Sequence, residues 1–105
     1  GIENCFKFEQ FFFFFFPQLG TMLPFGVIRE EEFSPVKNAE GTDSPKTART
    51  MIGKLHREWL VKAHVEVKPG KLYEVSPTIS YAGEGLSRRV FERELGKNIL
   101  EFEDA

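Results

Sequence analysis

The feature that most constrains the fold is an amphipathic pattern that begins at Ser44. Ser44 is a favourable N-cap residue, and Pro45 takes the first helical position, where its missing N–H group costs nothing. Small and apolar residues then recur at spacings of three and four, and most basic residues fall elsewhere on the helical wheel. The apolar positions are Ala48, Met51, Ile52, Leu55, Trp59 and Ala63. The pattern predicts a helix over residues 44–64, roughly 30 Å long, whose apolar face packs on a sheet.

Six consecutive phenylalanines, Phe11–Phe16, are the second unusual feature. On a helix, at about 100° per residue, they cover every face, so such a helix must be buried all round. As a strand the run exposes Phe on both sides, and a short uncharged aromatic segment aggregates when it has no partner. A third alternative is an irregular or corrupted stretch without functional content. Pro17 is expected to end the element.

Turn-forming residues divide the chain on both sides of the long helix. Before the helix, the apolar segment 25–28 predicts a short strand. Segment 33–45 is rich in Ser, Pro, Asn, Gly and Asp, a composition that favours irregular backbone, and we expect an ordered loop there.

After the helix, residues 65–67 and 72–75 are apolar and flank a Pro-Gly turn at 69–70, which predicts a β-hairpin. The chain then favours a short helix over residues 87–94 and a last strand over residues 98–102.

Charge and cysteine content exclude several classes of protein. Lys plus Arg (14) nearly balances Asp plus Glu (16), so the net charge of −2 provides no basic field for nucleic acid or anionic lipid. The Phe run is far shorter than the ~20 residues that span a bilayer, and no basic segment precedes it as in a signal peptide. The single cysteine, Cys5, cannot form an intrachain disulfide. We expect a cytoplasmic protein that binds neither nucleic acid nor membrane.

Catalytic and metal-binding patterns are weak. Cys5, His56 and His64 fall on separate predicted elements, so nothing orients a nucleophile and a base. The two histidines lack a third ligand at metal spacing, and the carboxylates of Glu30–Glu32 are typical of a solvated stretch. Gly83-Glu84-Gly85 lacks the strand and helix that flank a phosphate-binding loop. The sequence therefore predicts no catalytic residue and no metal ligand within this chain.

One lysine follows a proline-stiffened loop. Lys37 comes two residues after Pro35 in the loop predicted over 33–45. A lysine held on an ordered loop is a compact charge suited to phosphate oxygens, whereas a lysine on a free surface only adds solubility. Composition alone leaves both interpretations open.

Two ordered blocks of sequence resemble one family. Residues 28–39 (IREEEFSPVKNA) closely resemble a signature of the UDP-N-acetylhexosamine pyrophosphorylases, and the likeness continues through residues 44–49 (SPKTAR) and Trp59. A second block, residues 74–77 (EVSP) and 80–86 (SYAGEGL), resembles another segment of the same family. Uridylyltransferases that act on glucose 1-phosphate carry a related Phe-x-Pro-x-Lys, but the residues around it here favour the N-acetylhexosamine branch. The discriminating residues are Ser34, Asn38 and Ala39.

The resemblance implies an α/β fold. The chain would be a C-terminal fragment of a nucleotide-diphospho-sugar transferase (Rossmann-like) fold, with one long helix and several short strands. Residues 1–64 would end the catalytic α/β domain and include a sugar-phosphate loop (33–39) and the long helix (44–64). Residues 65–105 would form a small C-terminal β-rich segment.

The resemblance also implies a reaction and two binding residues. The family transfers a uridylyl group from UTP to N-acetylglucosamine 1-phosphate with Mg²⁺, giving the UDP-sugar and pyrophosphate. The family lysine that contacts the sugar phosphate corresponds to Lys37. A second family lysine, which binds the nucleotide, lies thirty positions upstream in a Lys-x-Glu-x-Phe context, and Lys7 matches both the spacing and the context. Both lysines would neutralise phosphoryl charge electrostatically.

Departures from the family limit these expectations. Phe14 stands where the family has an acidic residue. The glycine-rich loop, the base-binding residues and the aspartate that binds Mg²⁺ precede the matched region in the family, and nothing in the chain replaces them. We therefore expect the chain alone to be inactive and to need an N-terminal catalytic half. The alternative is a non-catalytic relic or interaction fragment whose helix and Phe run seek a partner surface. Preference between N-acetylglucosamine and N-acetylgalactosamine stays open.

Overall fold

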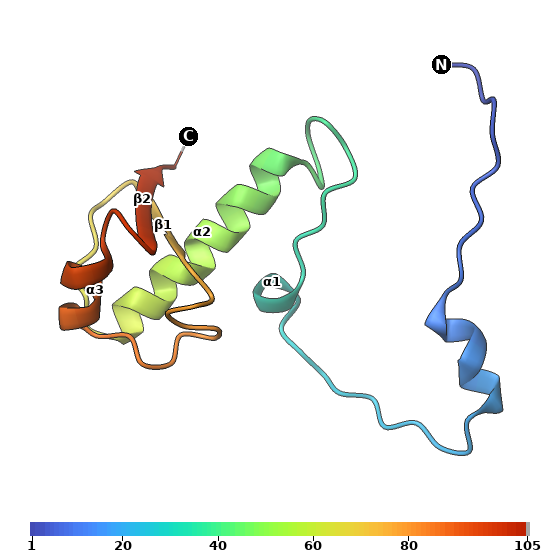
Figure 1. Ribbon diagram of the computed structural model, residues 1–105, viewed down its shortest axis with the longest axis horizontal. Helices are drawn as coiled ribbons and strands as arrows, with labels where there is room; N and C mark the ends of the chain where they lie inside the picture. Colours follow the sequence, from blue (N-terminus) through green and yellow to red (C-terminus); the bar gives the residue numbers. More distant parts are fainter. Residues whose placement is uncertain (105) are drawn as a thin grey trace.

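A computed structural model describes residues 1–104 of the 105-residue chain. Along the sequence it contains the 3-10 helix η1 (Phe12–Gln18), the helices α1 (Arg29–Glu32) and α2 (Pro45–Lys62), strand β1 (Lys71–Val75), helix α3 (Arg88–Glu94) and strand β2 (Ile99–Glu103). Figure 1 shows α2, α3 and the two strands packed together, with residues 1–28 as an arm that runs apart from them. The arm explains a radius of gyration of 18.5 Å, against roughly 13 Å for a compact domain of about 100 residues.

Helix α2 confirms the predicted long helix, including its start. The Ser44 side chain accepts a hydrogen bond from the Thr47 backbone N–H, and the Thr47 hydroxyl accepts one from the Ser44 backbone N–H, which together form a capping box. At the other end, Val65 N–H donates to Leu60 C=O and His64 N–H donates to Val61 C=O. This pair of bonds is a Schellman motif, which satisfies carbonyls that the helix end would leave unpaired.

The sheet has two antiparallel strands in the described residues, and its pairing differs from the predicted hairpin. β1 pairs with β2, in a register that places Lys71 opposite Glu103 and Val75 opposite Ile99. Residues 65–67 form no strand, so the hairpin prediction was wrong. Val65 instead completes the Schellman motif and turns inward onto Leu60. The predictions of α3 and of the last strand are confirmed to within a residue, and the structure shows Ser87 as the N-cap of α3.

The core lies between α2 and the sheet. Its fully or nearly fully buried members are Leu60, Val65, Tyr73, Val75 and Ile99. The face of α2 that packs on β1 includes Gly53, where an added Cβ would lie only 2.8 Å from the Leu72 Cβ. The face of α2 that packs on the sheet is therefore rotated about the helix axis from the predicted apolar face. Ile52, which was predicted to lie on the packed face, is 43% exposed. Met51 and Leu55 instead border hollows shared with α1.

The Phe run forms η1 and lies on the surface of the arm. Phe11 to Phe15 are 49–68% exposed, so the expectation of an all-round buried helix was wrong. Pro17 lies inside the 3-10 helix, which continues to Gln18. The rings pack on one another instead, with the Phe12 and Phe13 centroids 4.3 Å apart.

The strand predicted over residues 25–28 does not form, and those residues are exposed. None of the helices in residues 1–104 combines the length and apolar character that crossing a bilayer requires.

Candidate functional site

The loop that carries Lys37 is closed by hydrogen bonds between its own residues. The N–H groups of Lys37 and Asn38 both donate to the carbonyl oxygen of Asp43, at 2.6 and 3.0 Å. The Asn38 side-chain amide donates to the Thr42 carbonyl at 2.7 Å. Three bonds thus join the two ends of a seven-residue loop, residues 37–43, and the predicted ordered loop is present.

Asp43 gives the loop its closing turn. Its φ of 52° lies in the left-handed region, which Asp and Asn tolerate better than other residues with a Cβ. This conformation directs the Asp43 carbonyl toward Lys37 and Asn38. The next residue is Ser44, the buried N-cap of α2. The loop therefore ends directly on the first turn of the longest helix.

The Lys37 side chain is exposed. Within residues 1–104 its amino group has neither a hydrogen bond nor an ion pair with a protein carboxylate. The loop therefore fixes the backbone of Lys37. Its amino group has no protein carboxylate partner within residues 1–104 and can form a charge-assisted hydrogen bond to an external anion such as phosphate.

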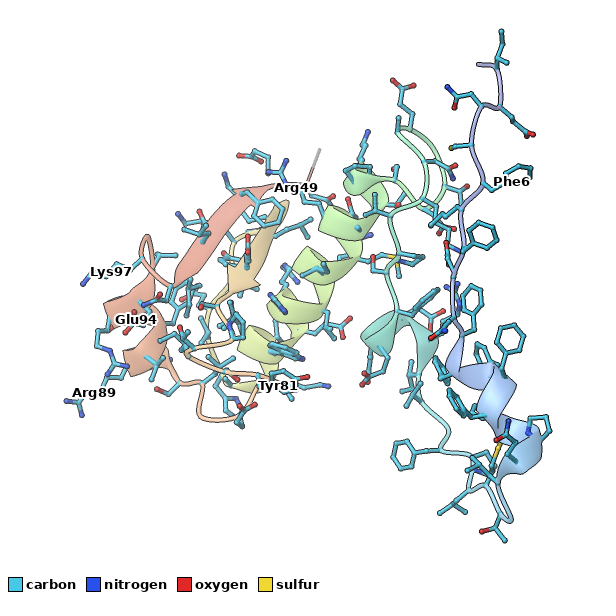
Figure 2. All side chains as sticks on the ribbon, turned by 45° about the vertical axis from the view of Figure 1, so that its right-hand side comes forward. Phe6, Arg49, Tyr81, Arg89, Glu94 and Lys97 are labelled. Atoms are coloured by element: carbon cyan, nitrogen blue, oxygen red, sulfur yellow. The ribbon has the colours of Figure 1, made fainter. Side chains whose placement is uncertain are left out.

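Lys7 is in a different setting. It lies on the arm, is exposed, and pairs with Glu9 two residues along the chain. No hydrogen bond or ion pair joins it to the Lys37 loop in the part of the chain that the structure describes. Figure 2 shows Phe6, its neighbour, on the arm and well separated from Arg89 and Glu94 of α3. The hydrogen bonds and ion pairs of residues 1–104 therefore do not link the two predicted binding lysines.

Residues 80–86 of the second sequence block form a loop held by Glu84. One carboxylate oxygen accepts from the Tyr81 backbone N–H at 2.8 Å, and the other accepts from the Ala82 N–H at 2.6 Å and the Ser80 hydroxyl at 3.2 Å. These bonds, with the backbone N–H donors foremost, lower the pKa of Glu84 to about 2. Gly83 lies directly over the Trp59 ring, since a Cβ there would be 3.0 Å from Trp59 Cγ. The block is a structural brace against α2.

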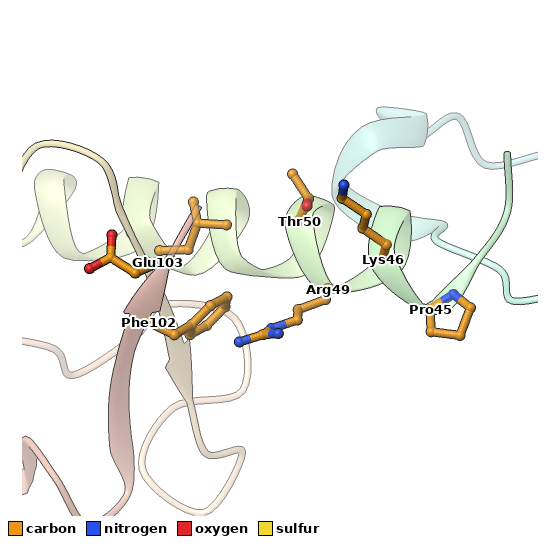
Figure 3. Close-up of a pocket in the computed structure, with 7 residues that line it drawn as sticks. Pro45, Lys46, Arg49, Thr50, Phe102 and Glu103 are labelled. Carbon is orange, nitrogen blue, oxygen red and sulfur yellow. The ribbon is translucent and has the colours of Figure 1, made fainter. Parts of the chain in front are cut away.

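A shallow hollow beside the sheet is lined by residues of α2, β1 and β2. Figure 3 shows the Arg49 side chain extending toward the Phe102 ring. The Arg49 guanidinium carbon lies 4.5 Å from the ring centroid, a cation–π contact. Glu103 at its rim is paired with Lys71. The contact ties the first half of α2 to β2.

The polar side chains weighed for catalysis lie apart. Cys5 is exposed on the arm. The His56 ring is half-buried, accepts a hydrogen bond from Val75 N–H and lies against Trp59. His64 follows the C-cap of α2 and has a positive φ of 61°. Within residues 1–104, no three His, Cys, Asp or Glu side chains gather as a metal site would require. These residues do not fit a metal centre.

Sequence reasoning singled out Lys37 as a candidate but not the residues whose hydrogen bonds hold its loop. Asn38, Asp43 and Thr47 fix the loop, and only the capping role of Ser44 was foreseen. The available signal was the order Asp43-Ser44-Pro45, in which a residue that tolerates left-handed backbone immediately precedes an N-cap.

Comparison with known proteins finds relatives along most of the chain. UDP-N-acetylglucosamine diphosphorylase 2 of Arabidopsis thaliana is 45% identical over 87 residues, covering 76% of this chain and 17% of the relative. UDP-N-acetylglucosamine pyrophosphorylase of Saccharomyces cerevisiae is 44% identical over 98 residues, covering 86% of this chain and 20% of the relative. Human UDP-N-acetylhexosamine pyrophosphorylase-like protein 1 is 34% identical over 121 residues, covering 96% of this chain and 24% of the relative.

These three relatives are matched over 17% to 24% of their own length. No family model matches the chain, and no solved structure matches it.

Proposed function

This chain is homologous to part of the eukaryotic UDP-N-acetylglucosamine and UDP-N-acetylhexosamine pyrophosphorylases, and we propose that it supplies the sugar-phosphate side of such an active site. The complete enzyme would transfer a uridylyl group from UTP to N-acetylhexosamine 1-phosphate. The chain alone would be inactive, because a positioned lysine cannot by itself bind and orient both substrates.

The Lys37 loop carries the proposal. Its backbone is closed onto Asp43, and its lysine amino group is exposed without a carboxylate partner within residues 1–104. Such a charge can neutralise a phosphate oxygen without first giving up an internal ion pair. Fixing the loop backbone in advance also reduces the entropy lost when the sugar phosphate binds.

The proposal extends to the nucleotide and to Mg²⁺, which would bind with the help of a Rossmann-like α/β domain outside this chain. Lys7 would contact the nucleotide once the arm packs on the nucleotide-binding α/β domain, where its pair with the neighbouring Glu9 is weak enough to exchange for a phosphate. Mg²⁺ would be held by residues of that domain, since no three His, Cys, Asp or Glu side chains of residues 1–104 gather as a metal site would require. We also propose a cytoplasmic location for the protein.

A hybrid enzyme tests the assignment. Residues 1–105 would replace the matched segment of the Saccharomyces cerevisiae relative, and uridylyl transfer would be measured with UTP, Mg²⁺ and N-acetylglucosamine 1-phosphate. We expect the hybrid to turn over and the isolated chain to be inactive. In the hybrid, Lys37→Ala should lower kcat/KM by about a hundredfold, the usual effect of removing one preorganised electrostatic contact.

Lys54→Ala is the matched control, because Lys54 is an exposed lysine of α2 that the proposal gives no role in binding. Equal losses for Lys37→Ala and Lys54→Ala would reject the role of Lys37. Robust turnover by the isolated chain would reject the claim that it is inactive alone.

A second candidate function is a non-catalytic relic or interaction fragment, which the exposed apolar arm favours. Phe6, Phe8, Leu23 and Phe25 are 89–94% exposed, and free apolar surface of this kind seeks a partner. Mixing the chain with the N-terminal remainder of the yeast relative separates the two functions. Association that restores activity supports the pyrophosphorylase role, whereas association without activity supports the interaction fragment.

A further inference from the structure

We propose that the first turn of α2 positions Lys37 through one peptide group, the one between Asp43 and Ser44, and that Thr47 and Asn38 are the positioning residues. The inference rests on the proposed binding role of Lys37. It adds residues that the resemblance does not assign, and it explains how a surface lysine can be held in register with a helix.

The carbonyl side of this peptide group faces the lysine. The Asp43 oxygen accepts from the backbone N–H groups of Lys37 and Asn38, at 2.6 and 3.0 Å. The oxygen therefore binds the residue that carries the functional amino group and the residue that follows it. Any rotation of the peptide plane would weaken both bonds together, because hydrogen-bond strength depends on direction as well as distance.

The N–H side of the same peptide group faces α2. The Ser44 N–H donates to the Thr47 hydroxyl oxygen at 2.9 Å, and that hydroxyl in turn donates to the Ser44 carbonyl at 3.0 Å. Thr47 is thus a two-way link within the helix's first turn. The peptide plane is held from both sides, by Thr47 on one and by the Lys37 loop on the other.

Asn38 provides a second restraint on the same loop. Its side-chain amide donates to the Thr42 carbonyl at 2.7 Å, across the loop from Lys37. This bond restrains Thr42, and through it the left-handed turn at Asp43. Fixing backbone in this way is costly in entropy, and the helix cap and the Asn38 bond together supply compensating interactions.

Helix capping alone is the competing explanation of the Thr47 contacts. A cap stabilises α2 and would act on the whole fold without preference for Lys37. Positioning predicts a selective effect on Lys37 and on the ligand that Lys37 binds. The variants Thr47→Val, which removes the hydroxyl at nearly constant shape, and Thr47→Ser, which keeps it, separate the two.

Amide hydrogen exchange on the 105-residue chain tests the link directly. Thr47→Val should speed exchange of the Lys37 and Asn38 amides by about fivefold, the factor for one ordinary hydrogen bond, and leave the Val65 amide at the other helix end unchanged. Thr47→Ser should restore slow exchange. Thr50→Val is the matched control, because the Thr50 hydroxyl makes no hydrogen bond within residues 1–104. Unchanged Lys37 and Asn38 amides in Thr47→Val would overturn the proposal, as would an equal effect of Thr50→Val.

Kinetics in the hybrid enzyme test the functional consequence. Thr47→Val and Asn38→Ala should each raise the KM for N-acetylglucosamine 1-phosphate by about fivefold and leave the KM for UTP unchanged. In a Lys37→Ala background, Thr47→Val should add nothing, because Thr47 acts through Lys37. Additive effects, or equal changes in both KM values, would contradict positioning. An inactive unsubstituted hybrid would instead count against the proposed function, and the exchange measurement would still decide whether α2 holds Lys37.

Discussion

The Nδ1 atom of His56 accepts a hydrogen bond from the backbone N–H of Val75 at 3.0 Å. A side chain of α2 thereby pairs with a backbone donor of β1 that β2 does not use. The His56 ring also lies 4.4 Å from the Trp59 ring, which itself supports the loop at Gly83. The His56 imidazole thus links α2 to β1. It also contacts the Trp59 ring, against which the loop at Gly83 packs.

The His56 contact predicts a pH dependence of stability. Burial lowers the pKa of His56 below its ordinary value of 6.5, and the carboxylate of Glu74 partly opposes the shift. The unfolded chain therefore takes up a proton at a higher pH than the folded one, so the free energy of unfolding falls as the pH drops below 6.5 and is unaffected well above it. Urea unfolding at about pH 7.5 and about pH 5.5 measures this loss.

His56→Gln should flatten that decline, because glutamine retains an acceptor for Val75 N–H but does not titrate. His64→Asn, at the exposed histidine, should keep it, and asparagine tolerates the left-handed backbone there. A decline of the same size in His56→Gln would show that other groups cause the loss.

Gly53→Ala should destabilise the fold although alanine favours helix. The added methyl group would lie 2.8 Å from Leu72 Cβ and 2.9 Å from Phe102 Cζ, so the sheet would have to move away from α2. Overpacking costs about 1–3 kcal/mol, which outweighs the roughly 1 kcal/mol gained in helix propensity. Chemical denaturation measures the change, with Lys54→Ala on the exposed face as the control. A more stable Gly53→Ala variant would contradict the close approach.

Local signals predicted α2, α3 and the residues of the two strands, but not helix α1 or which strands pair with each other. Ser44 was recognised as a cap because a cap needs only residues within one turn. The hairpin failed because Val65 is used by the end of α2, while the true partner of Val75 is Ile99. Two apolar segments around a Pro-Gly turn suit a hairpin, and nothing local shows that a later strand competes for β1.

The sequence singled out a lysine on the loop of residues 37–43, but not the hydrogen bonds that support this loop. The resemblance pointed to Lys37, and the composition of residues 33–45 indicated an ordered loop. The closing bonds depend on a positive φ at Asp43 and on the orientation of one peptide plane, which residue types do not determine. The functional roles of Lys37 and Lys7 stay predictions.

Glu84→Gln should weaken the brace over Trp59. The Glu84 pKa of about 2, against an ordinary 4.5, means that the carboxylate stabilises the fold above pH 4.5 and loses this contribution as the pH falls toward 2. The variant should therefore be less stable than the unsubstituted chain at neutral pH, with a difference that shrinks in acid. Thermal unfolding across that pH range measures the difference in stability between the variant and the unsubstituted chain. Glu92→Gln is the control, because the Glu92 carboxylate is exposed and makes no such bonds within residues 1–104, and it should show no difference in stability. A gap that is constant with pH would refute the assigned cause.

His64→Gly should stabilise the chain. His64 occupies the position after the C-cap of α2 with a φ of 61°, where a Cβ is strained by about 1 kcal/mol and glycine is preferred. Its side chain is exposed, so little packing is lost, and the Schellman bonds of residues 64 and 65 use backbone groups that glycine retains. We expect a net gain of up to about 1 kcal/mol, reduced by the greater freedom of glycine in the unfolded chain. Ala63→Gly, one residue earlier at a φ of −83°, relieves no strain and should destabilise. Urea unfolding compares the two, and a loss of stability in both variants would show that the left-handed turn at His64 costs the fold nothing.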